Sequence, residues 1–151
     1  MLESDLLVPG RIFADVRISS KKRLLEFVSQ TLAKKNTELS AREIFESLCN
    51  REILGSTALG NGVAIPHGRV TGIEGAEALF LRLSKPLLFD TEDGQAVDLV
   101  FAVGFPIECS EDHSKLLSSI SSRFSDPELQ AQLRAAADAT EIWQLLSKTH
   151  A

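Results

Sequence analysis

The chain has 151 residues, of which 44% are hydrophobic and 25% charged, and its formal net charge is −5. This length and balance predict one globular domain over residues 1–151, and the acidic charge argues against a general nucleic-acid-binding protein, which usually carries a basic face. No apolar run approaches the ~18 residues that span a bilayer, no basic segment opens a signal peptide, and the two cysteines are far apart. We therefore expect a cytoplasmic protein with reduced thiols and no direct membrane insertion.

The first third of the chain predicts a strand followed by two helices. Apolar residues alternate over residues 12–18, which indicates a strand. The serines at 19–20 are typical N-cap residues, so a helix is predicted over 21–35. A second helix begins with a capping box at residues 40–43, Ser-Ala-Arg-Glu, and is expected to end near residues 50–51.

Two further strands are predicted in the middle of the chain. The first covers residues 76–83 and is followed by a long turn, which contains Pro86 and the polar run 90–94. The second covers residues 97–105 and ends at Pro106. It is almost continuously apolar, as expected of a strand that is buried on both faces.

The last third of the chain predicts three helices. The first begins at Ser110, and the second begins at residues 126–128, where aspartate is the cap and proline the first helical residue. The third contains the apolar residues of the segment 142–146. Because a strand buried on both faces needs a layer on each side, we predict an α/β (α+β) fold, a three-layer α/β/α sandwich. The close spacing of the middle strands implies a hairpin, and therefore a mixed sheet.

A glycine-rich segment surrounds one histidine. Six of the nine glycines lie between residues 55 and 75, and such clusters mark backbone that turns tightly or is approached closely. His67 lies in this segment, between Pro66 and Gly68, at the predicted end of a short apolar strand. Neutral imidazole is a good nucleophile near pH 7. These neighbours favour a nucleophile that meets a bulky anionic reactant over a histidine that is merely hydrogen-bonded at a strand end.

Two other side chains could serve such a reactant. His113 lies in the first turn of a predicted helix, on the apolar stripe that should face the sheet, where the helix N-terminus favours anions. The alternative is a histidine at the edge of the core, bonded to a backbone carbonyl. Arg51 is suited to bidentate contact with a phosphoryl group, and the alternative is a favourable charge near a helix C-terminus.

The glycine-rich loop could also contribute backbone N–H groups and hydroxyls to an anion. The residues predicted to cradle a phosphate in this way are Ser56, Thr57, Gly60, Asn61, Gly62 and Gly68. Ser56, Thr57 and Asn61 could instead simply stabilise the loop. No cofactor is predicted, and no metal site either, because His67, His113 and Cys109 lack the local spacing of metal ligands.

With these residues identified, the chain resembles enzyme IIA of the bacterial phosphoenolpyruvate-dependent phosphotransferase system (PTS). The match is to the fructose/mannitol superfamily, and within it to the nitrogen-regulatory branch, EIIA-Ntr. The matching segments are Arg-Glu-Ile-Leu-Gly-Ser-Thr at 51–57 and Leu-Gly-Asn-Gly-Val-Ala-Ile-Pro-His-Gly at 59–68. The resemblance also includes Phe89-Asp90, Val97-Asp98-Leu99 and His113, and it runs over essentially the whole chain.

The resemblance implies that His67 accepts a phosphoryl group on Nε2 from the phosphohistidine of an HPr- or NPr-type carrier protein. It implies that His113 and Arg51 are the second active-site histidine and the active-site arginine. Regulatory targets such as sensor kinases or potassium transporters would then respond to the phosphorylation state. Ala58 and Ser114 depart from the family pattern. These departures bear on which partner proteins the chain binds more than on whether His67 is phosphorylated.

Two alternatives to this regulatory phosphocarrier stay open. One is a sugar-permease enzyme IIA, a phosphotransferase that passes the phosphoryl group to a separate IIB domain. The other is a degenerate member of the family that binds partners without being phosphorylated. The presence of Arg51, His67 and His113 together argues against the second alternative.

Overall fold

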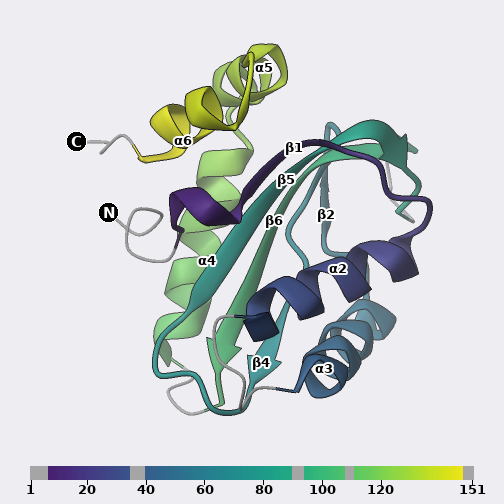
Figure 1. The fold of residues 1–151 in the computed structure, drawn as a ribbon, viewed down its shortest axis with the longest axis vertical. Coiled ribbons are helices and arrows are strands. Elements are labelled where there is room, and N and C mark those ends of the chain that lie inside the picture. The colour runs from purple at the N-terminus through teal and green to yellow at the C-terminus, as the bar shows by residue number, and fades with distance from the viewer. Residues whose placement is uncertain (1–6, 35–39, 90–93, 108–110, 148–151) are drawn as a thin grey trace.

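A computed structural model describes residues 7–34, 40–89, 94–107 and 111–147 (Figure 1). The elements, in chain order, are η1 (Pro9–Arg11), β1 (Ile12–Val16), α2 (Lys21–Lys34), α3 (Ala41–Leu54), β2 (Ala58–Gly60), β3 (Val63–Ala64), β4 (His67–Val70), β5 (Glu77–Leu87), β6 (Val97–Pro106), α4 (Glu111–Phe124), α5 (Pro127–Ala135) and α6 (Ala139–Ser147).

The sheet is mixed, as predicted. Its strand order is β1-β5-β6-β3-β2, and β4 pairs with β6 beyond the end of β3. β5 and β6 form the expected antiparallel pair, whereas β1 runs parallel to β5, and β3 and β4 run parallel to β6. The central strand β6 is therefore bordered along its length by β5 on one side and by β3 and β4 on the other.

Helices cover both faces of this sheet. α2 and α3 lie on one face and α4 on the other, with α5 and α6 following α4 at the end of the chain (Figure 1). Residues of β6 alternate between the two resulting cores: Val100 and Ala102 pack toward α2 and α3, and Phe101 and Val103 toward α4 to α6. The predicted three-layer sandwich is confirmed.

Several element ends differ from the prediction. α3 begins as predicted, since the Ser40 hydroxyl accepts from the Glu43 N–H at 3.2 Å, but it continues to Leu54. Arg51 is therefore inside the last turn and not at its end. β5 continues through Pro86, where the sequence predicts a turn. The pairing of β5 with β6 is irregular between Arg82 and Leu87, so the missing N–H of the proline interrupts no regular ladder.

Two predicted helix starts have different outcomes. The Asp126 carboxylate caps α5 by accepting from the Glu128 N–H at 3.0 Å, with Pro127 as the first helical residue, as predicted. Ser110, the predicted start of α4, lies outside the described residues, and the helix is described from Glu111.

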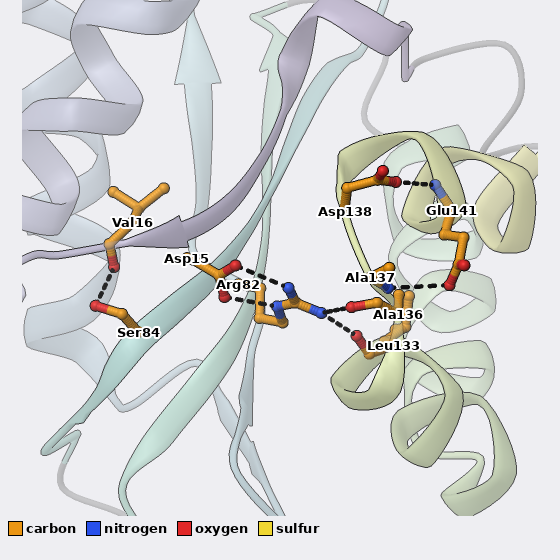
Figure 2. Close-up of polar contacts among 9 residues, drawn as sticks. All are labelled: Asp15, Val16, Arg82, Ser84, Leu133, Ala136, Ala137, Asp138 and Glu141. Atoms are coloured by element: carbon orange, nitrogen blue, oxygen red, sulfur yellow. Dashed lines mark hydrogen bonds and ion pairs between the residues drawn. The ribbon is translucent and has the colours of Figure 1, made fainter.

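A buried arginine in β5 connects the sheet to the C-terminal helices (Figure 2). Arg82 donates from Nε and Nη2 to the Asp15 carboxylate of β1, at 3.2 and 3.1 Å. Its Nη1 donates to the backbone carbonyls of Leu133 and Ala136, at 3.0 and 2.6 Å. Asp15 has a φ of 58°, at an irregularity of β1 that turns its carboxylate toward the guanidinium. Arg82 thus links β1, β5 and the end of α5.

Replacing Arg82 with methionine is expected to lower the free energy of unfolding by about 2–6 kcal/mol. The Leu133 and Ala136 carbonyls would lose a buried donor, and each unsatisfied group costs about 1–3 kcal/mol. Asp15→Asn is the matched control and should cost less than about 1 kcal/mol, because the side chain of Asp15 is 64% exposed. Urea unfolding followed by circular dichroism measures both variants. Equal losses of unfolding free energy in the two variants would show that Arg82 stabilises the fold through the Asp15 ion pair and not through the carbonyl contacts.

Candidate active site

His67 is the first residue of β4, and not the last residue of a strand as predicted. β3 ends at Ala64, and Ile65 and Pro66 connect it to β4 along the same side of β6. The Pro66 carbonyl accepts from the Val103 N–H at 3.0 Å, whereas the Ile65 carbonyl contacts Nδ1 of His67 at 2.9 Å. The short break between the two strands therefore sets the orientation of the imidazole.

The two ring nitrogens of His67 have opposite hydrogen-bonding roles. A backbone carbonyl can only accept, so Nδ1 carries the proton and donates it to Ile65. Nε2 lies 3.2 Å from Nε of Arg51, and because a guanidinium can only donate, Nε2 must carry the lone pair. Arg51 is itself held by a 2.8 Å bond from Nη1 to the Gly55 carbonyl. Both contacts favour the tautomer in which Nε2 is the nucleophilic atom.

The surroundings of His67 favour the neutral form of its imidazole. Burial lowers the pKa of His67 below its ordinary value of 6.5, and the nearby Arg51 guanidinium also lowers it. The hydrogen bond to the Ile65 carbonyl and the Glu52 carboxylate raise the pKa, but they do not compensate. A neutral imidazole retains the lone pair that a nucleophile needs.

The pKa of His67 in the folded chain is expected to lie below 6.5, as measured by a pH titration of its imidazole ¹⁵N resonances. The unfolded chain takes up this proton near pH 6.5, before the native chain does. The contribution of His67 to stability should therefore be unaffected above pH 6.5 and should decline as the pH falls from 6.5 to the native pKa. A His67→Ala chain should lack this part of the stability profile. A titration midpoint at or above 6.5 would contradict the expectation.

His67 faces a pocket of about 380 Å³ that is open to solvent. Arg51 from α3 and His113 from α4 line the same pocket, so the structure brings together the three residues predicted for one site. Phe105 lies between the two imidazoles, with its ring centroid 6.2 Å from that of His67 and 4.6 Å from that of His113. A guanidinium and two imidazoles around an open pocket are suited to bind a phosphoryl group.

Residues 5–149 match the family described as phosphoenolpyruvate-dependent sugar phosphotransferase system, EIIA 2. The chain belongs to the EIIA 2 family. It is 42% identical to the nitrogen regulatory protein of Bradyrhizobium diazoefficiens over 147 residues, which cover 95% of this chain and 94% of that protein. It is 39% identical to the nitrogen regulatory protein of Pseudomonas aeruginosa over 141 residues, which cover 93% and 92%.

The fold of this EIIA 2 chain also matches a solved structure of the nitrogen-regulatory branch. The nitrogen regulatory protein IIA-Ntr from Neisseria meningitidis superposes with a TM-score of 0.90 at 37% identity, over 97% of this chain and 99% of that one. The resemblance predicted from the two motif segments is therefore confirmed, both for the family and for the branch.

The turn Gly60-Asn61-Gly62 of the EIIA 2 chain lies away from His67, in contrast to the predicted phosphate cradle. All three residues have positive φ, and the turn joins β2, which ends at Gly60, to β3. The Gly62 carbonyl accepts from the Asp98 N–H at the start of β6, whereas His67 pairs with Val103. Five residues of strand separate these positions along β6, about 16 Å at a strand's ~3.3 Å rise per residue.

The remaining predicted cradle residues have structural contacts. Gly68 lines the pocket, but an added Cβ there would lie 2.7 Å from the Ser47 hydroxyl, so glycine is needed for the close approach of α3. Ser56 accepts from the Ala58 N–H at 3.2 Å, and the Thr57 hydroxyl donates to the carboxylate of Glu52. Ser56 and Thr57 do not line the pocket.

Arg69 also lines the pocket, and the sequence-based reasoning missed it. It lies two residues after His67 on β4, and side chains two apart on a strand share a face. Arg69 donates from Nη1 to the Ile107 carbonyl at 2.9 Å. Arg69 would have been predicted as a pocket residue if the sequence had been interpreted as a strand that begins at His67, because residues two apart on a strand share a face.

Metal binding, membrane crossing and thiol chemistry find no support in the described part of the chain. No three of its histidine, cysteine, aspartate and glutamate side chains are grouped so as to hold a metal ion. None of its helices combines the length and the apolar composition that a membrane crossing requires. Cys109, considered with His67 and His113, lies outside the described residues. Burial raises the pKa of the Cys49 thiol, which disfavours its reactive thiolate.

Proposed function

We propose that this chain is a regulatory phosphocarrier of the cytoplasm, acting as one EIIA 2 domain. His67 accepts a phosphoryl group on Nε2 from the phosphohistidine of an HPr- or NPr-type carrier protein. The observation that carries the proposal is the pair of contacts on one imidazole, from Nδ1 to the Ile65 carbonyl and from Arg51 to Nε2. Together they present a neutral ring, with its lone pair on Nε2, at the open pocket.

The transfer itself is a displacement at phosphorus. The P–N bond to the donor histidine breaks as the bond from phosphorus to Nε2 of His67 forms, roughly in line with it. Arg51 must release Nε2 in this step, and its N–H groups then turn to the phosphoryl oxygens. The proton on Nδ1 stays in place, where the Ile65 carbonyl stabilises the positive charge that develops on the ring. His113, across Phe105, is the second group near the transferred phosphate.

Phosphorylation places a group with about two negative charges at the pocket of a chain whose net charge is already −5. These charges would repel acidic partner surfaces and attract basic ones around the pocket, so the phosphorylation state can control binding. The similarity to nitrogen regulatory proteins favours this regulatory role over a metabolic one. Sensor kinases and potassium transporters are the classes of target we propose.

One experiment tests the function directly. The chain is incubated with phosphoenolpyruvate, enzyme I and an HPr- or NPr-type carrier, and its intact mass is measured with and without enzyme I. We expect an adduct of about +80 Da that is labile in acid and stable in base, as for phosphohistidine. A chain without adduct would instead be a degenerate binding module. Adding a IIB domain then distinguishes the roles, because loss of the adduct to IIB would identify a relay in sugar transport.

A further inference from the structure

A buried carboxylate lies next to Arg51 in the sequence and has no part in the chemistry described above. The side chain of Glu52 is only 6% exposed. Its Oε2 lies 2.8 Å from Nζ of Lys21, at the start of α2, and the same ammonium lies 4.6 Å above the ring centroid of Phe89. A buried charge costs several kcal/mol unless it is paired and hydrogen-bonded. The other contacts of the Glu52 carboxylate therefore decide how its burial is stabilised.

Two further hydrogen bonds of the Glu52 carboxylate connect it to Thr57. The Thr57 hydroxyl donates to Oε1, and the Thr57 backbone N–H donates to Oε2 at 3.4 Å. Thr57 is itself 6% exposed. Glu52 therefore fastens the connection that follows α3, residues 55–57, back onto the last turn of that helix.

The connection 55–57 positions Arg51 directly and His67 through Ile65. The Gly55 carbonyl accepts from Nη1 of Arg51 at 2.8 Å. The Thr57 carbonyl accepts from the Ile65 N–H at 3.0 Å, and the Ile65 carbonyl accepts in turn from Nδ1 of His67. A continuous series of contacts thus runs from Glu52 through Thr57 and Ile65 to the imidazole.

Glu52 also acts on His67 through its charge. Among the described residues, the charged groups near the imidazole include Arg51 and Glu52 from α3 and Arg69 on the same strand, and the titratable His113 from α4 lines the same pocket. The Glu52 carboxylate raises the pKa of His67, whereas the Arg51 guanidinium lowers it. The two neighbouring residues of α3 therefore have opposite electrostatic effects on the nucleophile.

We infer that Glu52 is a positioning residue for phosphoryl transfer. Through Thr57 it fixes the connection 55–57, and so holds Nε of Arg51 against Nε2 of His67 and the Ile65 carbonyl against Nδ1. The inference rests on the proposed function for the reaction, but the arrangement that it explains exists in the unphosphorylated chain. The competing explanation is an ion pair that only stabilises the packing of α2 against α3.

The test uses two nearly isosteric variants and one rescue. Glu52→Gln removes the negative charge, and Thr57→Val removes the hydroxyl. Thr57→Ser is the rescue variant, because serine keeps a hydroxyl at this position. Glu52→Gln and Thr57→Val should each slow phosphorylation of His67 about tenfold, since small misplacements of reacting groups have effects of this order. In ¹⁵N spectra of the unphosphorylated chain, both should populate the second tautomer of His67. Thr57→Ser should stay within about twofold of the natural chain.

Asp98→Asn is the matched control. It weakens a partly buried ion pair with Arg134 at the far end of β6, and should lower thermal stability without changing the transfer rate or the His67 spectrum. The inference is overturned if Glu52→Gln and Thr57→Val behave like Asp98→Asn. If Glu52→Gln does not fold, the inference is tested by comparing the transfer rates and His67 tautomers of Thr57→Val and Thr57→Ser. If the natural chain accepts no phosphoryl group, the proposed function fails, and the tautomer of His67 in the variants still decides this inference.

Discussion

Replacing His67 with alanine is expected to abolish phosphorylation of the chain. The imidazole supplies the only atom to which the proposed reaction attaches phosphorus, and alanine offers neither a lone pair nor a substitute. The chain should remain folded, because the main loss is the hydrogen bond to the Ile65 carbonyl, worth about 1 kcal/mol. Intact mass after incubation with phosphoenolpyruvate, enzyme I and the carrier measures the adduct, and thermal unfolding measures the fold.

His113→Ala is the informative comparison for this variant. Both imidazoles face the same pocket, and Phe105 separates them. If His113 only helps to hold the phosphoryl group, its loss should slow the transfer and leave the adduct on His67. An adduct that persists in the His67→Ala chain, and disappears only when His113 is also replaced, would show that His113 and not His67 is the acceptor.

The fold was largely predictable because its signals are local. The capping box at Ser40 and the Asp126-Pro127 start of α5 depend on contacts within one helical turn, and both appear in the structure. The apolar run of β6 reflects burial on both faces. Element ends were less predictable: Pro86 is tolerated in β5 only because the pairing with β6 is irregular there, and no local pattern shows that.

Site residues were predictable where their side-chain chemistry agrees with a sequence motif. They were less predictable where membership of the site depends on the distance between residues in the folded chain. Arg51, His67 and His113 are charged or titratable residues at specific places, and the fold brings them to one pocket. Gly60, Asn61 and Gly62 are close to His67 in sequence, but the intervening residues are extended along β6. These three residues are therefore far from His67 in the structure, although they are near it in the sequence. The contacts of Glu52 with Lys21 and Thr57 depend on tertiary packing, which the sequence pattern does not reveal.

A second large effect is expected for Arg51→Lys, which should slow phosphorylation about 10- to 100-fold, or about 1.4–2.8 kcal/mol in activation free energy. The arginine contacts Nε2 of His67 and the Gly55 carbonyl with two different nitrogens. Lysine keeps the positive charge but presents a single ammonium, which cannot reproduce both contacts or bind two phosphoryl oxygens side by side. The helix should be unaffected, because lysine and arginine have similar helix propensities. Transfer rates from the phosphorylated carrier measure the effect.

Two further variants separate the geometry of Arg51 from its charge. Arg42→Lys makes the same exchange on an exposed residue of α3, paired with Glu46, and should leave the rate unchanged. Arg51→Gln removes the charge as well, and should raise the pKa of His67, because the guanidinium lowers it. Arg51→Lys should keep more of that lowering and still be slow. If Arg51→Lys instead transfers as fast as Arg42→Lys, Arg51 is only a favourable charge near the end of α3, because the two-pronged contact would then contribute nothing to transfer.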